Sequence, residues 1–187
     1  MSCLLIRGTP LSGLRLIERK PIGDERGFLQ RLFCQESFES LLGGKTIRQI
    51  NHTMTCKAGA VRGMHFQHPP HAEIKIVSCL KGKVWDVAVD LRKGSPTFLK
   101  YHAVMLSADL PQSYFIPEGF AHGFQVLTPD SELIYFHTAD YDPASEGVIN
   151  ALDPALRIQW PMMITERSRR DEQHAMLLDS FAGVNLR

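Results

Sequence analysis

Most of the chain consists of short apolar runs bounded by residues that favour turns, and this pattern restricts the fold more than any other feature. Residues 84–91 are the clearest case, because their side chains alternate between two faces and Lys-Gly-Ser-Pro then turns the chain. Similar runs lie at residues 14–17, 28–33, 46–54, 73–80, 99–106, 123–127 and 132–138. Many short strands with frequent turns predict an all-β sandwich or barrel.

Two segments favour a helix instead of a strand. Residues 35–42 place apolar side chains on one face, and two glycines follow as a stop. After residue 153 the strand pattern fades into a polar tail, in which residues 169–181 favour a terminal helix. No linker or repeat interrupts the chain, so we predict one domain over residues 1–187, with the tail 154–187 packed on the barrel.

The balance of charges limits the class of partner. The 187 residues include 21 basic and 20 acidic side chains, which gives a formal net charge of +1. Nucleic acids and membrane surfaces attract concentrated basic patches, so neither is an expected partner. The sequence has no apolar run near the roughly 18 residues of a membrane span and no evident signal peptide. We expect a soluble cytoplasmic protein that holds any anionic ligand with a few placed cations.

The four cysteines are widely spaced, at positions 3, 34, 56 and 79. Zinc sites bring two ligands close in sequence, and disulfide scaffolds are shorter and denser in cysteine. The pattern therefore predicts reduced thiols.

Residues 59–67, which read Gly-Ala-Val-Arg-Gly-Met-His-Phe-Gln, contain Arg, Gly, His and Gln, and these residue types are unusual within a strand. Strand interiors favour β-branched and aromatic residues. Gly63 predicts a bulge or a close backbone approach, which would let Arg62 and His65 face the same space. Together with Lys75 this pattern indicates a functional site, and a surface strand with scattered polar residues is the alternative.

A second polar segment, residues 114–124, contains Pro-x-Gly-x-x-His, which is typical of the second metal-binding motif of cupin barrels. The first cupin motif would place two histidines two residues apart, but His65 is followed by Gln67. His65, His122 and at most Glu73 make a weak ligand set, because tight catalytic metal sites usually use three protein ligands. We therefore expect a cupin-like barrel without a metal.

Five segments together resemble the dTDP-4-dehydrorhamnose 3,5-epimerase family, over about residues 7–178. They occur in the family's order and spacing at residues 23–28, 62–67, 86–92, 116–124 and 168–171. The resemblance implies a cupin-like jelly roll that dimerises by exchanging strands. It also implies a nucleotide-diphosphate sugar as substrate and no metal or other cofactor.

The resemblance also implies catalytic roles that suit proton abstraction beside a ketone. His65 matches the base, whose ordinary pKa lies near neutrality. Asp171 matches the carboxylate that binds the far ring nitrogen, and Lys75 matches the cation that stabilises the oxyanion. Tyr135 matches the acid that returns a proton to the opposite face, although a packing role in its aromatic-rich strand is the alternative.

Binding roles carry over from the family to a further set of polar residues. Guanidinium groups suit a diphosphate because each can bind two oxygens at once. The matching positions are Arg26, Gln49, Asn51, Arg62, His122, Glu146 and Arg170.

One departure concerns the nucleotide. Arg31 stands where the family has a glutamate that reaches the nucleotide end of the ligand. A carboxylate can accept a hydrogen bond from thymine N3–H, whereas arginine only donates. The nucleotide, or the way its base is held, is therefore predicted to differ from dTDP, with a cytosine base as one option. Alternatively, Arg31 faces solvent and Gln30 compensates.

The leading function is inversion at C3, C5 or both of a nucleotide-linked 4-keto-6-deoxyhexose. A 3,4-ketoisomerase and a single-site epimerase on another nucleotide sugar, for example one linked to CDP, are the enzymatic alternatives. A non-catalytic cupin that binds sugar nucleotides is the third, but pure binding has no evident use for an acid and a base together.

Overall fold

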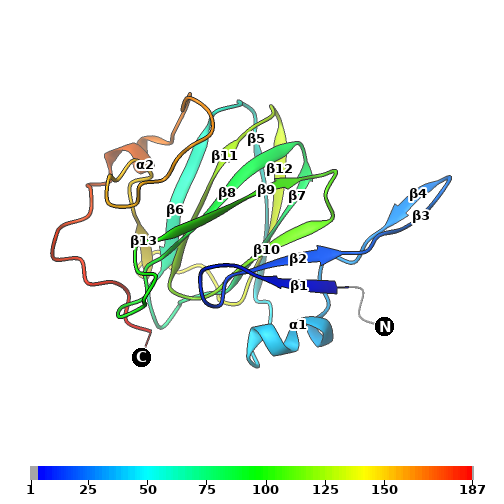
Figure 1. Cartoon of the computed structure of the whole chain (residues 1–187), viewed down its shortest axis with the longest axis horizontal. Coiled ribbons are helices and arrows are strands. Elements are labelled where there is room, and N and C mark those ends of the chain that lie inside the picture. The colour runs from blue at the N-terminus through cyan, green and yellow to red at the C-terminus, as the bar shows by residue number, and fades with distance from the viewer. Residues whose placement is uncertain (1–3, 187) are drawn as a thin grey trace.

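The computed structural model of the chain describes residues 4–186. Two antiparallel sheets face each other, and a two-stranded hairpin projects to one side (Figure 1). The prediction of an all-β fold is therefore confirmed. Neither helix in the described range is long and apolar enough to cross a membrane.

The first sheet has six strands in the order β1-β2-β10-β7-β12-β5, which are β1 (Leu4–Gly8), β2 (Arg15–Arg19), β10 (Gln112–Ile116), β7 (Lys75–Lys81), β12 (Ser131–His137) and β5 (Gln49–Thr55). The second has five in the order β13-β6-β11-β8-β9, which are β13 (Glu146–Val148), β6 (Val61–Gln67), β11 (Phe120–Val126), β8 (Lys83–Asp90) and β9 (Tyr101–Ser107). The projecting hairpin pairs β3 (Ile22–Asp24) with β4 (Gly27–Leu29), and the helices are α1 (Gln35–Leu42) and α2 (Arg169–Gln173).

Strand β8 illustrates how the five-stranded sheet is buried on both faces. Val84 and Ala88 pack in a cluster with Leu133, which comes from the facing sheet. Val87 and Val89 belong to a second cluster, which lies under the C-terminal part of the chain. Burying apolar side chains from water stabilises the sandwich by about 25 cal/mol per Å². Although apolar and polar residues alternate along part of β8, neither face of the strand is exposed to solvent.

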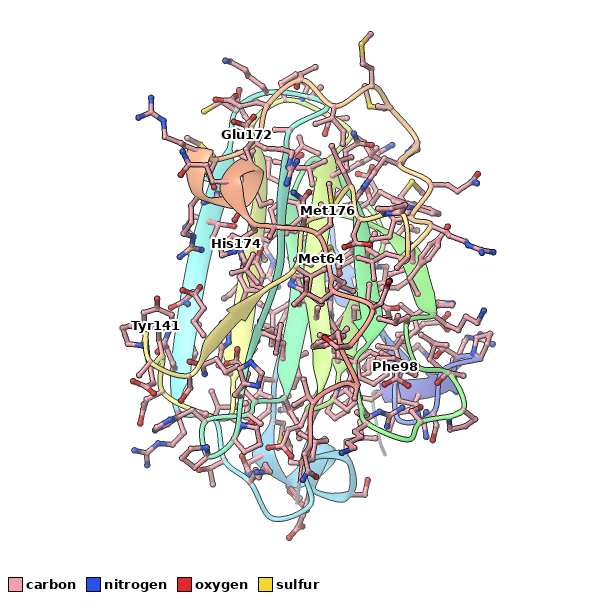
Figure 2. All side chains as sticks on the ribbon, turned by 90° about the vertical axis from the view of Figure 1, so that its left-hand side faces the viewer. Met64, Phe98, Tyr141, Glu172, His174 and Met176 are labelled. Carbon is pink, nitrogen blue, oxygen red and sulfur yellow. The ribbon has the colours of Figure 1, made fainter. Side chains whose placement is uncertain are left out.

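The C-terminal segment covers the outer face of the five-stranded sheet, and Figure 2 shows it crossing the strands with His174 and Met176 on it. The predicted helix over residues 169–181 is wrong beyond Gln173, because α2 ends there. Two side chains from the loop after β13 bind the backbone that follows α2: Asn150 donates to the His174 carbonyl oxygen, and Asp153 accepts from the Leu177 amide. These contacts replace the helical hydrogen bonds.

Helix α1 covers the outer face of the six-stranded sheet and has the predicted bounds. Phe38 and Leu42 are buried against Ile76 and Phe136 of that sheet. Gly43 ends the helix with a positive φ of 58°, a conformation that favours glycine, and its amide donates to the Glu39 carbonyl oxygen.

The projecting hairpin, which we call the arm, corrects a second prediction. The strand expected over residues 28–33 ends at Leu29, because the chain then leaves the hairpin and Leu32 and Phe33 pack beside α1. Strands β1, β3, β10 and β13 were not predicted, and the other strands begin or end a few residues from their predicted limits.

Candidate active site

A bulge in β6 brings two predicted site residues to one space. The register between β6 and β11 shifts between His122 and Phe124, opposite Gly63. Gly63 has a φ of +110°, and a Cβ there would lie 2.6 Å from the His122 carbonyl oxygen. Arg62 and His65 consequently line the same two cavities, which confirms the predicted bulge and close approach.

Two cavities adjoin at this point and share Arg62, His65 and Arg170 as walls. The inner cavity, of about 280 Å³, lies between the sheets. The outer cavity, of about 640 Å³, lies between the ends of β5 and β6 and the segment that leads into α2. The remaining walls of the inner cavity are Asn51, Thr53, Lys75, His122, Gly123, Phe124, Tyr135 and His137.

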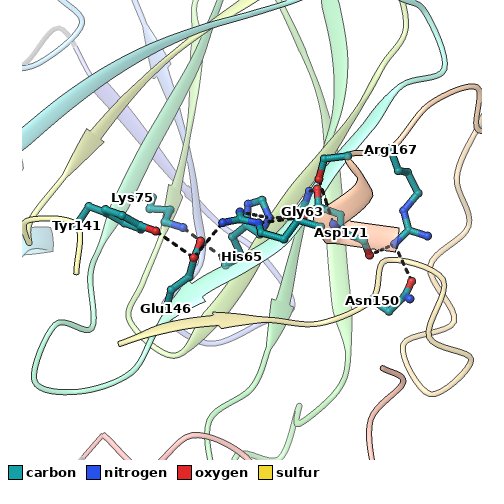
Figure 3. A network of polar contacts seen from close by, with 10 residues as sticks. Gly63, His65, Lys75, Tyr141, Glu146, Asn150, Arg167 and Asp171 are labelled. Carbon is teal, nitrogen blue, oxygen red and sulfur yellow. Dashed lines mark hydrogen bonds and ion pairs between the residues drawn. The ribbon is translucent and has the colours of Figure 1, made fainter. Parts of the chain in front are cut away.

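His65 on β6 is paired with Asp171, a buried residue in the first turn of α2. His65 Nε2 lies 2.8 Å from Asp171 Oδ1, and the Gly63 amide donates to Asp171 Oδ2 over 3.3 Å (Figure 3). Ser168 begins the helix and accepts from the Asp171 amide. Burial would raise the pKa of Asp171, but the hydrogen bond and charge of His65 outweigh it and hold that pKa at about 2.

A chain of polar contacts continues from this pair toward solvent. The Arg170 guanidinium lies 3.3 Å from His65 Nε2, and its Nη1 lies 3.0 Å from Glu146 Oε2. Tyr141 donates its hydroxyl to the same Glu146 oxygen over 3.1 Å (Figure 3). Arg170 therefore places a cation at the mouth of both cavities, and Glu146 orients it.

Lys75 and Tyr135 approach the inner cavity from the opposite sheet. Lys75 Nζ lies 3.3 Å from the His65 carbonyl oxygen, and the lysine side chain is only 10% exposed. Tyr135 pairs with Asn51 on β5, and its phenol is buried. Burial raises the pKa of Tyr135 above its usual range, although the nearby Thr53 hydroxyl opposes this. The phenol is therefore a protonated donor at neutral pH.

His122 lies at the back of the cavity and is itself paired with a buried carboxylate. Its Nε2 is 2.9 Å from Asp86 Oδ1, and its ring meets the edge of the Tyr135 ring at a centroid distance of 5.9 Å. Burial raises the pKa of Asp86 despite the opposing effect of His122. Within residues 4–186 no three His, Cys, Asp or Glu side chains form a group that could hold a metal ion.

Residues 8–179 match the family model of dTDP-4-dehydrorhamnose 3,5-epimerase. The chain belongs to this family. It is 43% identical to the dTDP-4-dehydrorhamnose 3,5-epimerase of Salmonella typhimurium strain LT2 over 178 residues, which cover 94% of this chain and 96% of that protein. As a family member the chain is an isomerase that acts on nucleotide sugars, and its fold is the family's cupin barrel.

Two solved structures extend the comparison. The Legionella pneumophila epimerase in complex with dTDP-4-keto-L-rhamnose is 38% identical, with a TM-score of 0.91 over 98% of this chain and 99% of that one. A 3'-monoepimerase from Streptomyces bikiniensis in complex with dTDP-quinovose is 33% identical, with a TM-score of 0.84 over 90% of this chain and 85% of that one.

Most residues that the sequence assigned to an epimerase site come together. Gln49 contacts these residues from outside the cavity. Its side-chain amide donates to Asn51 Oδ1 and accepts from the backbone amide of Tyr141. Arg26 and Arg31 lie apart from it: Arg26 is on the arm in an ion pair with Asp24, and Arg31 is exposed where the arm ends.

Sequence reasoning missed a histidine that lines the inner cavity and pairs with the strand of Lys75. His137 lies on the same face of β12 as Tyr135, two residues after it, and lines the inner cavity. The alternation of a strand could have revealed it. Glu73, considered from the sequence only as a weak metal ligand, binds His137 instead.

Three of the four cysteines fall within the described residues, and all three are free. The reduced state of these thiols stays a prediction, and Cys3 lies outside the described residues.

Proposed function

We propose that the chain inverts C3 and C5 of a dTDP-linked 4-keto-6-deoxyhexose by proton transfer without a metal or other cofactor. The observation that carries the proposal is the placement of His65 and Tyr135 on facing sheets of one cavity of about 280 Å³. Inversion needs a base on one side of the sugar ring and a proton donor on the other. A site that only binds has no need of both.

The base in this proposal is His65. Asp171 is ionised and accepts the Nε2 proton, so Nδ1 keeps its lone pair for the proton next to the ketone. The pair also stabilises the imidazolium that forms, as in other histidine–carboxylate pairs.

Lys75 and Tyr135 complete the proton transfer. Removal of the proton leaves negative charge on the keto oxygen, which the Lys75 ammonium stabilises in a water-poor cavity. Tyr135 then gives its proton to the carbanion carbon from the opposite face. Without this donor, His65 would return the proton to the original face or exchange it with solvent.

The diphosphate is proposed to lie against Arg62 and Arg170, which border both cavities. Each guanidinium can bind two phosphate oxygens. In this proposal Asn51, supported by Gln49, binds the ligand from the wall of the inner cavity, and His122 binds the sugar at the back of that cavity. The dTDP-sugars in both solved relatives support the nucleotide assignment.

The test is solvent deuterium exchange into a dTDP-4-keto-6-deoxyglucose substrate, followed position by position by NMR. Exchange with inversion at C3 and C5 is expected, in line with the 43% identical 3,5-epimerase. Exchange at C3 alone would favour a monoepimerase. Movement of the carbonyl would favour a ketoisomerase, and the absence of exchange with any nucleotide sugar would overturn the proposal.

A further inference from the structure

A buried triad of polar side chains, Glu73–Lys75–His137, lies beside the proposed acid and base. Glu73 Oε1 lies 3.2 Å from Lys75 Nζ, and Glu73 Oε2 lies 2.8 Å from His137 Nδ1. The three side chains are only 8, 10 and 11% exposed, respectively. One carboxylate thus bridges an ammonium and an imidazole within the wall of the cavity.

The triad is built into the sheet that carries Tyr135. His137 pairs with Lys75 on β7 and with Gln49 on β5, two residues along the strands from the pair formed by Tyr135 and Asn51. The His137 ring stacks on Tyr135 at a centroid distance of 6.0 Å, and its Nε2 lies 3.4 Å from Asn51 Nδ2. Both ring nitrogens of His137 therefore have a polar partner, Glu73 for Nδ1 and Asn51 for Nε2.

These contacts assign a hydrogen-bond partner to each nitrogen of the His137 ring. Nδ1–H donates to the Glu73 carboxylate, which leaves Nε2 to accept from the Asn51 amide. Burial would raise the pKa of Glu73, but Lys75 and His137 outweigh it and keep that pKa below its usual range. Glu73 remains ionised and holds the lysine ammonium at one place.

We infer that Glu73 and His137 are positioning residues that hold Lys75 against the keto oxygen of the substrate. The inference rests on the proposed function. Lysine has a long flexible side chain, and its stabilisation of an oxyanion depends on where the ammonium lies. Glu73 supplies the anchor, and His137 fixes the second carboxylate oxygen so that the first points at Lys75.

The test compares Glu73→Gln, His137→Leu and the double variant with wild type, using kcat, KM and the rate of deuterium exchange. Each single variant is expected to lose about 10- to 100-fold in kcat, as a displaced catalytic group does, with KM within about threefold. The double variant should be no slower than the slower single variant, because the two residues act as a unit. His137→Asn keeps an N–H near the Nδ1 position and should retain more activity than His137→Leu.

A matched control lies on the same strands. His52 on β5 and Glu132 on β12 form a pair with a 3.0 Å contact, but on the outer face of the sheet. His52→Leu and Glu132→Gln should leave kcat unchanged. The affinity for dTDP alone, measured by calorimetry, should be the same in every variant that folds.

The outcomes separate the two hypotheses. If wild type exchanges deuterium and Glu73→Gln and His137→Leu keep its kcat, the positioning role is wrong while the proposed function stands. If dTDP affinity falls together with kcat, the pair is structural and the inference is likewise overturned. If wild type itself neither exchanges nor epimerises the substrate, the proposed function fails first and this role fails with it.

Discussion

His65 Nε2 lies 2.8 Å from Asp171 Oδ1, although 106 residues separate the two in sequence. The contact depends on the bulge at Gly63, whose amide also donates to Asp171, and on the short helix that Ser168 begins. Strand β6 and helix α2 therefore meet at the hydrogen bond between His65 and Asp171, which sets the tautomer of the proposed base.

Asp171→Asn should disable that base while leaving the fold intact. The amide can donate to Nε2, which moves the ring proton to Nδ1 and removes the lone pair that faces the substrate. We expect kcat to fall by up to about 10⁴-fold, the loss that the corresponding change causes in a Ser-His-Asp triad, and we expect His65→Asn to abolish exchange. Asp179→Asn, an exposed change in the same tail, is the control. Normal deuterium exchange in Asp171→Asn or His65→Asn would assign the base elsewhere.

Tyr135→Phe should separate exchange from inversion. The variant keeps His65 and Lys75, so the sugar should still exchange protons with solvent, but no donor remains on the opposite face. Incubation in D₂O is expected to give labelled substrate with retained configuration and almost no epimer. Tyr101→Phe removes a hydroxyl that lies outside both cavities, so this variant should behave as wild type. Full inversion by Tyr135→Phe would reduce this tyrosine to a packing role.

The sequence predicted what local pattern controls and missed what distant contacts decide. Helix α1 and strand β8 were found because apolar spacing and a glycine stop are local signals. The helix after Arg169 was predicted too long because Asn150 and Asp153, far back in the chain, bind the backbone that follows Gln173. Strand β13 has three residues and exists through its pairing with β6.

The same division holds within the site. The bulge at Gly63 followed from the residues alone. The partnership of His65 with Asp171 followed from family resemblance, because no spacing rule relates positions 106 residues apart. His137 was missed since its partner Glu73 lies on the approach to a different strand.

Asp171 should also make the stability of the protein sensitive to acid. Its pKa is about 2 in the folded chain and about 3.9 in an unfolded one. The unfolded state therefore binds the proton first, so the stabilisation is complete above about pH 4 and is lost as the pH falls toward 2. Urea unfolding at fixed protein concentration should show the advantage of wild type over Asp171→Asn shrinking as the pH falls from about 4 to 2. A difference that stays constant over this range would contradict the assignment.

The arm predicts self-association. Ile22, Phe28 and Leu29 are 69, 68 and 75% exposed on a hairpin that projects from the barrel (Figure 1). Exposed apolar side chains that lie together mark an interaction surface, and the family resemblance implies a dimer with exchanged strands. Light scattering should give about twice the chain mass of 21.1 kDa. The double change Phe28→Ser and Leu29→Ser should shift the protein toward monomer, whereas Met163→Ser, at an even more exposed site outside the arm, should not. A monomeric wild type at micromolar concentration would refute the exchange.

Arg31 should determine how the nucleotide base is held. In an exchanged dimer the arm would carry this exposed side chain to a partner's site, where a guanidinium can donate to a base carbonyl oxygen but cannot accept from thymine N3–H. Wild type is therefore expected to discriminate weakly between dTDP and dCDP. Arg31→Glu restores an acceptor and should raise the preference for dTDP about tenfold, since one hydrogen bond to a charged group contributes about 1.5 kcal/mol or more. Calorimetric titration of both nucleotides measures the ratio, with Arg157→Glu as a control for the same change of charge. An unchanged ratio in Arg31→Glu would place the side chain in solvent and leave base recognition to Gln30 or another group.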